Sequence, residues 1–165
     1  MPVSTIAALF IHDLSDAYSA EKQMTRSLPK LARAATDEGL VSAFETHLDE
    51  TRSQVERIEQ IAELLQLKLK RVRCEGMAGM IDEGDSLMDL VEKGPVLDAA
   101  LIGAARKVEH YEIAGYQSLC TLAKQLGHTD AIQLLEASLA EETATDGKLS
   151  ALAEAQIAEE AVQAE

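Results

Sequence analysis

Apolar residues recur every three or four positions along four long stretches of this 165-residue chain, and no other feature limits its fold as strongly. That spacing gathers apolar side chains on one face of an α-helix, which must then be buried against other helices. The first stretch starts after Ser4, a good N-cap, and continues past Pro29, where we expect a kink rather than a break. Residues 36–39 (Thr-Asp-Glu-Gly) predict the turn into a second stretch that ends near Leu65.

A long connection follows, from about 67 to 95. It contains a basic cluster at 68–73 and a short amphipathic segment at 77–91, and it closes with Gly94 and Pro95. The basic cluster is typical of a solvated crossover, or of a patch that pairs with acidic faces of the same protein.

A second hairpin completes the chain. Its first arm ends at Gly127, a residue suited to the position after a helix, and Thr129 is expected to cap the second arm. The acidic end, about 158–165, is expected to fray. We therefore predict one all-α domain over 1–165: a four-helix bundle of two αα-hairpins, joined by a long crossover with a short extra helix.

The composition excludes several classes of partner. The chain has 15 Lys and Arg against 29 Asp and Glu, a formal net charge of −14, and such a surface repels nucleic acid. No apolar stretch of the sequence approaches the roughly 20 residues that are needed to cross a bilayer. The apolar stretch at 3–11 lacks the basic start and the cleavage site of a secretory signal peptide. Cys74 and Cys120 stand alone, as reduced thiols do. We expect a cytoplasmic protein that binds neither nucleic acid nor membranes.

Acidic residues interrupt the apolar face of every long stretch. They are Glu21, Glu50, Glu112 and Glu142. Glu50 lies 14 residues from its turn at Thr36, and the other three lie 15 residues from Thr36 or Gly127. At about 1.5 Å per residue, all four carboxylates reach one level if both hairpins turn at the same end. A second layer, one helical turn further out, would comprise Tyr18, Gln54, Glu109 and Asp146.

The physical cost of this layer points to metal. Burying one unpaired carboxylate costs several kcal/mol, whereas a domain is stable by only about 5–15 kcal/mol. Divalent cations held by carboxylates from four helices remove that cost. The alternative is that each acid leans to solvent or pairs with an arginine. His47 lies nearer the turn than Glu50 and is assigned to packing or to the surface, and His110 faces away from Glu112.

The chain also resembles a known family. The resemblance rests on Asp16-Ala-Tyr-Ser-Ala-Glu21-Lys-Gln, His47-Leu-Asp-Glu50-Thr, Gln54-Val-Glu-Arg, Lys107-Val-Glu-His-Tyr-Glu112-Ile-Ala and Glu141-Glu142-Thr-Ala-Thr-Asp146-Gly-Lys-Leu. These strings closely resemble the YciF-type (YciE/YciF) bacterial stress proteins over nearly the whole chain. The resemblance implies a ferritin-like, dimeric protein whose biochemical activity is not established.

Resemblance to the wider ferritin and rubrerythrin superfamily implies metal ligands at Glu21, Glu50, Glu109, Glu112 and Glu142, with Asp146 where a histidine usually stands. Gln54, a weaker candidate, also replaces a histidine. An all-oxygen ligand set leans toward Mn, Mg or Ca, or toward an incompletely filled site. Since the first hairpin supplies fewer anions in the second layer, we expect uneven occupancy of two ions.

Three functions remain open at this stage. The first is a two-ion site for Fe or Mn that handles iron or peroxide during stress. The second is a structural or interaction protein that keeps a vestigial acidic core and catalyses no reaction. The third, metal storage in a ferritin-like cage, ranks lowest. Whether the chain is an enzyme stays open. The apolar crossover at 77–91, with Tyr111 and Tyr116, further predicts a homodimer.

Overall fold

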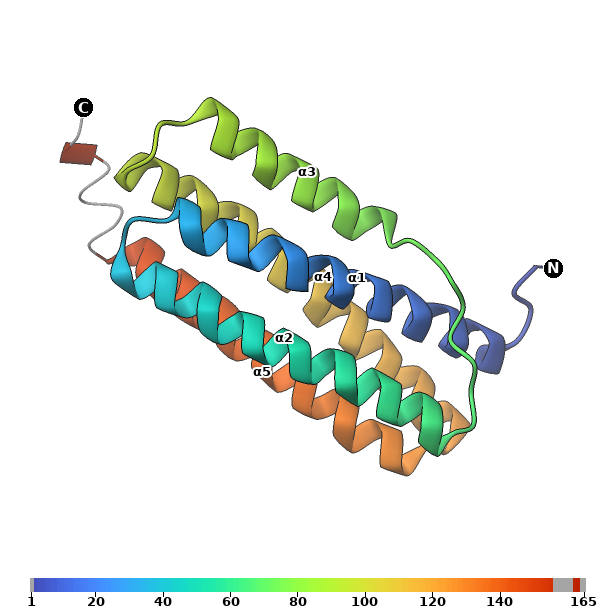
Figure 1. Cartoon of the computed structure of the whole chain (residues 1–165). Coiled ribbons are helices and arrows are strands. Elements are labelled where there is room, and N and C mark those ends of the chain that lie inside the picture. Colours follow the sequence, from blue (N-terminus) through green and yellow to red (C-terminus); the bar gives the residue numbers. More distant parts are fainter. Residues whose placement is uncertain (1, 156–161, 164–165) are drawn as a thin grey trace.

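The computed structural model describes residues 2–155 and 162–163, and within them it contains five helices and no strand. The helices are α1 (Ile6–Ala34), α2 (Glu38–Leu64), α3 (Glu75–Leu90), α4 (Pro95–Leu126) and α5 (Thr129–Glu154). The hairpins α1–α2 and α4–α5 form a four-helix bundle, and α3 packs outside it along α1 and α4 (Figure 1). The predicted all-α, ferritin-like bundle with an extra helix in the crossover is confirmed.

The helix ends follow local side-chain chemistry, with small corrections to the sequence analysis. Thr5, not Ser4, caps α1, because its Oγ1 accepts a hydrogen bond from the Ala8 N–H at 3.1 Å. The helix continues through Pro29. Asp37 caps α2, so that the turn is shorter than predicted and Glu38 already belongs to the helix. His128, rather than Thr129, occupies the N-cap position of α5, without a side-chain capping bond.

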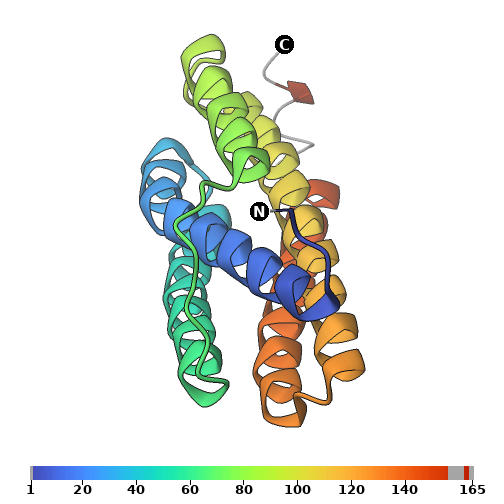
Figure 2. The same ribbon diagram turned by 90° about the vertical axis from the view of Figure 1, so that its right-hand side faces the viewer.

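The crossover runs along α1 before α3 begins (Figure 2). Two serine hydroxyls of α1 hold it: Ser15 Oγ accepts from the Lys70 N–H at 2.9 Å, and Ser19 Oγ accepts from the Cys74 N–H at 3.0 Å. Met77 of α3 is fully buried against the bundle. The bundle therefore covers part of the apolar face that was used above to predict a dimer.

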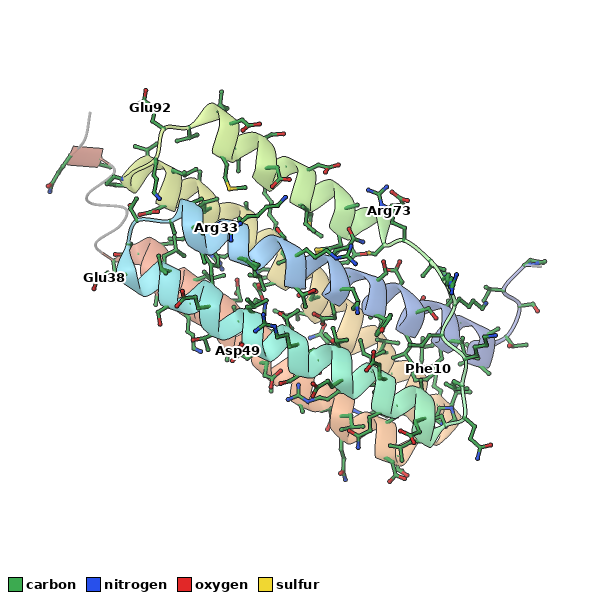
Figure 3. The ribbon with its side chains drawn as sticks, viewed as in Figure 1. Phe10, Arg33, Glu38, Asp49, Arg73 and Glu92 are labelled. Atoms are coloured by element: carbon green, nitrogen blue, oxygen red, sulfur yellow. The ribbon has the colours of Figure 1, made fainter. Side chains whose placement is uncertain are left out.

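The two hairpins turn at opposite ends of the bundle. The prediction that the four glutamates reach one level assumed that both hairpins turn at the same end, and that assumption is wrong. The Asp98 carboxylate near the start of α4 accepts hydrogen bonds from the Thr36 and Asp37 N–H groups, at 2.8 and 2.9 Å. At the other end, the ring of Phe10 in α1 contacts that of His128 in the second turn, with 5.5 Å between centroids. Figure 3 shows Glu38 and Phe10 at these two ends.

The core consists of two apolar clusters separated by a polar layer. One cluster surrounds the first turn and includes Met24, Phe44 and Leu101, and the other surrounds the second turn and includes Leu14 and Leu119. Between them, every bundle helix turns polar side chains inward. These are Glu21, His47, Thr51, Gln54, Glu109, Glu112, Ser138, Glu142 and Thr145. The fold thus places its buried charges near the middle of the long helices.

Two further expectations concern the chain end and its hydropathy. The acidic end at about 158–165, which we expected to fray, lies outside the described residues except for 162–163. In the described part of the chain, no helix combines the length and the apolar character that crossing a bilayer requires.

Candidate metal centre

Four buried side chains meet at the centre of the polar layer. His47 comes from α2, Glu109 and Glu112 from α4, and Glu142 from α5, and each offers one ligand atom such that all four atoms lie within 4.8 Å of one another. The four residues are between 0% and 5% exposed. Glu109 and Glu112 are three residues apart on one helix, so both can face the same interior point.

Unsatisfied polar atoms concentrate in this layer. Among the described residues, eight buried side-chain atoms have no hydrogen-bond partner, and they are Glu21 Oε2, His47 Nε2, Thr51 Oγ1, Gln54 Oε1, Glu109 Oε2, both Glu112 oxygens and Glu142 Oε2. All eight belong to the polar layer. An unpaired buried polar group costs about 1–3 kcal/mol, and more when it is charged. A cation is the group that a set of unpaired carboxylate oxygens and an imidazole nitrogen fits.

His47 is held by acidic neighbours on both sides of its ring. Nδ1 lies 3.2 Å from Glu50 Oε2 and 3.3 Å from Thr145 Oγ1, while Nε2 lies 3.2 Å from Glu109 Oε1 and 3.6 Å from Glu142 Oε2. Burial opposes the imidazolium, but the carboxylates of Glu109 and Glu50 outweigh it and raise the pKa of His47 well above its usual value. The bond from Nδ1 to Glu50 leaves Nε2 as the atom that faces the cluster.

Three carboxylates of the layer, those of Glu21, Glu112 and Glu142, retain protons readily. Burial, reinforced by the neighbouring acids, raises the pKa of Glu112 and of Glu142 well above the usual value. Burial also raises the pKa of Glu21 to about 7, although the Tyr116 hydroxyl donates a hydrogen bond to its Oε1 and partly offsets the shift. Without a cation, these acids compensate for burial by staying protonated.

An amide and an arginine border the layer on its other side. The Gln54 Nε2 group donates to Glu142 Oε1 and, at 3.0 Å, to Glu141 Oε2. Arg57 binds both oxygens of Glu141, at 2.6 and 2.7 Å. Glu141 is therefore already paired, whereas Gln54 keeps an unpartnered Oε1 in the layer.

Two of the predicted ligands lie outside the buried layer. Asp146 points outward, where Arg106 Nε donates to it at 2.8 Å and His110 Nε2 lies at 3.2 Å, and Arg106 lowers the pKa of Asp146. Glu50 is partly exposed and contacts the far side of His47, which lowers the pKa of Glu50. Arginine and histidine partners thus hold these two carboxylates away from the centre. Glu21, Glu109, Glu112, Glu142 and Gln54 are all in the buried layer.

His47 is the residue that sequence reasoning missed. With both turns at one end, His47 and Glu109 would lie on opposite sides of the layer. Because the turns lie at opposite ends, residues on the turn side of Glu50 in α2 reach the level of Glu109 in α4. The group brought together is consequently not all-oxygen. The His47-x-x-Glu50 and Glu109-x-x-Glu112 spacings carried the available signal, since residues three apart share a helix face.

Comparison with known proteins identifies the family. A family model described as a domain of unknown function (DUF892) matches residues 5–162. The chain belongs to this family. Protein YciF of Escherichia coli strain K12 is 55% identical over 154 residues, 93% of each protein. This confirms the YciF-type resemblance and makes the chain a member of the YciF stress-protein family.

Solved structures of similar proteins share the architecture. The crystal structure of the E. coli stress protein YciF matches with a TM-score of 0.88 at 56% identity, over 91% of this chain and 95% of that one. YcfI from Rhodopseudomonas palustris matches with a TM-score of 0.86 at 40% identity, over 90% and 94% of the two chains. The bundle and its crossover are thus the fold of the family.

Proposed function

We propose that this chain is a divalent-metal protein of the bacterial stress response that holds Fe or Mn among His47, Glu109, Glu112 and Glu142. One observation carries the proposal: the unpartnered buried atoms of the described residues all lie in the layer that contains these four side chains. A protein stable by about 5–15 kcal/mol retains such a set only where bound protons or a cation compensate for the buried charges. A cation is the partner that matches these donors.

The donor set favours particular metals. Carboxylates suit Mg, Ca and Mn, whereas imidazole suits Fe, Zn, Cu and Ni, so three carboxylates with one imidazole favour Mn and Fe, which accept both. Glu50 would position His47 by accepting a hydrogen bond from its Nδ1–H group, which directs Nε2 to the metal. This assigns Glu50 a supporting role beside the ligands.

A second, weaker ion fits the same layer. Glu21 Oε2 and Gln54 Oε1 remain unpartnered, and Glu112 has two free oxygens that could serve both ions. Gln54 is neutral and Glu21 already binds Tyr116, so this side offers less charge. We therefore infer uneven occupancy, with the ion at His47 bound more tightly. A bound Fe or Mn pair would supply redox chemistry toward O₂ or peroxide.

The test compares two histidines. Wild type purified without chelators is analysed for metal, and apo protein is then titrated with Mn(II), and with Fe(II) under anaerobic conditions. We expect one tight site and one weaker site in wild type. His47→Gln should abolish the tight site, whereas His110→Gln, an exposed histidine paired with Asp146, should leave it intact. Equal binding by the two variants, or no binding by wild type, would refute the proposal.

One observation favours the alternative of a structural or interaction protein with a vestigial acidic core. A protonated His47 between Glu50 and Glu109 is itself a buried cation, and it neutralises part of the layer. Under this alternative, added metal leaves the thermal stability of wild type unchanged, and His47→Gln destabilises the protein equally with and without EDTA.

A further inference from the structure

A cavity between α1 and α4 is lined in part by two residues of the buried layer. Its volume is about 290 Å³, and it is lined by side chains of these two helices only. The two helices pack against each other in the bundle (Figure 2). Small residues such as Ala17, Ala20 and Gly115 form much of its wall, so few side-chain atoms fill the space between the two helices.

The inner end of the cavity is formed by Glu21 and Glu112. These residues are 1% and 5% exposed, and three of their four carboxylate oxygens have no hydrogen-bond partner. Both side chains line the cavity. Two acidic residues of the polar layer therefore form part of the cavity wall, while their unpartnered oxygens are themselves shielded from solvent.

The outer end is acidic. Asp13 and Asp16 line the cavity and are half-buried. Asp13 precedes Glu21 by eight residues on α1, about 12 Å along the helix at 1.5 Å per residue. Carboxylates thus stand at both ends of a short path, and such an arrangement raises the local concentration of cations.

We propose that this cavity is the path by which the divalent cation enters the buried layer. The inference rests on the function proposed above and adds the route of entry. A water molecule occupies about 30 Å³ in the liquid, so the cavity has room for on the order of ten waters and admits a partly hydrated ion. Asp13 and Asp16 attract the ion, and the Glu21 and Glu112 side chains turn their carboxylates toward the cavity to receive it.

Gly115 provides a way to narrow this path without touching a ligand. It is exposed in the middle of α4, and a Cβ added there would meet nothing within 4 Å. Gly103 is its matched control, since it is also exposed on α4 with open space around it but does not line the cavity. Replacing either glycine by leucine adds the same side chain to the same helix.

The experiment measures the rate of metal uptake separately from its extent. Apo protein is mixed with Co(II), whose visible absorption reports ligand binding, in a stopped-flow instrument, and final stoichiometry is measured by dialysis. We expect Gly115→Leu to slow uptake about tenfold or more with unchanged stoichiometry, and Gly103→Leu to match wild type. The double variant Asp13→Asn/Asp16→Asn should slow uptake several-fold and weaken its dependence on salt.

The outcomes separate the two proposals. If Gly115→Leu protein takes up Co(II) at the wild-type rate, the cavity is not the entry path. If the double aspartate variant takes up Co(II) at the wild-type rate, Asp13 and Asp16 do not attract the ion. Full stoichiometry in these proteins leaves the metal site itself intact. Wild type that takes up no Co(II) would overturn both the site and the route. Circular dichroism of each variant excludes misfolding as the cause of slow uptake.

Discussion

Glu112 carries the least compensated carboxylate of the buried layer. Neither of its oxygens has a hydrogen-bond partner, and both burial and the neighbouring acids raise its pKa. We expect Glu112→Gln to stabilise apo protein at pH 8 by about 1–3 kcal/mol, because an ionised carboxylate no longer has to be buried. The same change should remove most of the stabilisation that Mn(II) gives to wild type. Chemical denaturation with EDTA or with Mn(II) measures both effects.

The control for this substitution is Glu136→Gln. Glu136 is an exposed residue of α5 that pairs with Lys124 at 3.3 Å, so this variant loses the same charge at the surface. It should change the free energy of unfolding by less than about 1 kcal/mol, with or without Mn(II). If the two variants behaved alike, the charge of Glu112 would have no special connection to a buried site.

Glu50 allows a test of positioning at the same scale. Its carboxylate contacts Nδ1 of His47, and Thr145 Oγ1 donates to it at 3.2 Å. We expect Glu50→Gln to weaken Mn(II) binding by about 10–100-fold, because the imidazole loses the acceptor that fixes its tautomer. The number of bound ions should not change. Glu45→Gln, an exposed change on the same helix, should bind as wild type does in the same titration.

The sequence predicted most of the acidic residues of the buried layer but not its histidine, His47. An acidic residue within an apolar helix face can be recognised from the sequence alone, which is why Glu21, Glu109, Glu112 and Glu142 could be proposed as metal ligands. Asp146 satisfies the same spacing, yet Arg106 and His110 bind it outside the bundle interior. Spacing alone cannot show such pairing, because partners on other positions decide which way a side chain turns.

At the scale of elements, Asp98 fastens the first turn to the start of α4. It is 2% exposed and accepts hydrogen bonds from the Thr36 and Asp37 N–H groups and from the Thr36 hydroxyl. We expect Asp98→Ala to lower the free energy of unfolding by about 2–4 kcal/mol, because three donors of the turn lose a buried, charged acceptor. Urea denaturation measures this loss, and Asp98→Asn should show a smaller one.

Asp89→Ala is the reference for that measurement. Asp89 is exposed near the end of α3, and its removal should change stability by no more than about 0.5 kcal/mol. A loss for Asp98→Ala no greater than the loss for Asp89→Ala would mean that the turn does not depend on this carboxylate.

The helices themselves were predictable, but their relative directions were not. A period of three to four residues identifies each helix from local sequence, and glycine, proline and capping residues mark its ends to within a few residues. Which ends the turns occupy depends on how the crossover runs. Glu21 and Glu142 nevertheless lie at similar heights along the bundle, although the turns are not at the same end. Each lies near the midpoint of its helix, of 29 and 26 residues respectively, so reversing the direction of the helix moves it little. His47 lies off the midpoint, and the same error misplaced it.

For the whole molecule, a homodimer remains a prediction whose basis has changed. Tyr116 is buried beneath α1 and donates to Glu21, so it cannot contribute to an interface. The exposed apolar residues now available include Leu90 and Val96, 81% and 47% exposed, on either side of the α3–α4 connection. We expect a dimer at micromolar concentration in sedimentation experiments, and a shift toward monomer in Leu90→Lys. A monomeric wild type would contradict this expectation.

The stability of the whole bundle should also depend on pH in a way that metal reverses. Glu21, with a pKa of about 7, and Glu112 and Glu142, also raised, hold protons in the folded state that the unfolded chain has released. A raised folded pKa gives stability that is complete below the unfolded value, near 4.5 for glutamate, and is lost as pH rises through the folded value. The raised pKa of His47 acts in the same direction, above its unfolded value of 6.5.

We therefore expect the free energy of unfolding of apo protein to fall between about pH 5 and pH 8, with Glu21 alone contributing a loss of about 3 kcal/mol by the linkage relation. Bound Mn(II) favours the ionised acids and neutral imidazole, so the loaded protein should keep or gain stability over the same interval and release protons on binding. Melting curves at several pH values, with EDTA and with Mn(II), measure the two profiles. Parallel profiles would show that these acids do not share a site with a cation, since only a bound cation can invert the dependence of their burial on pH.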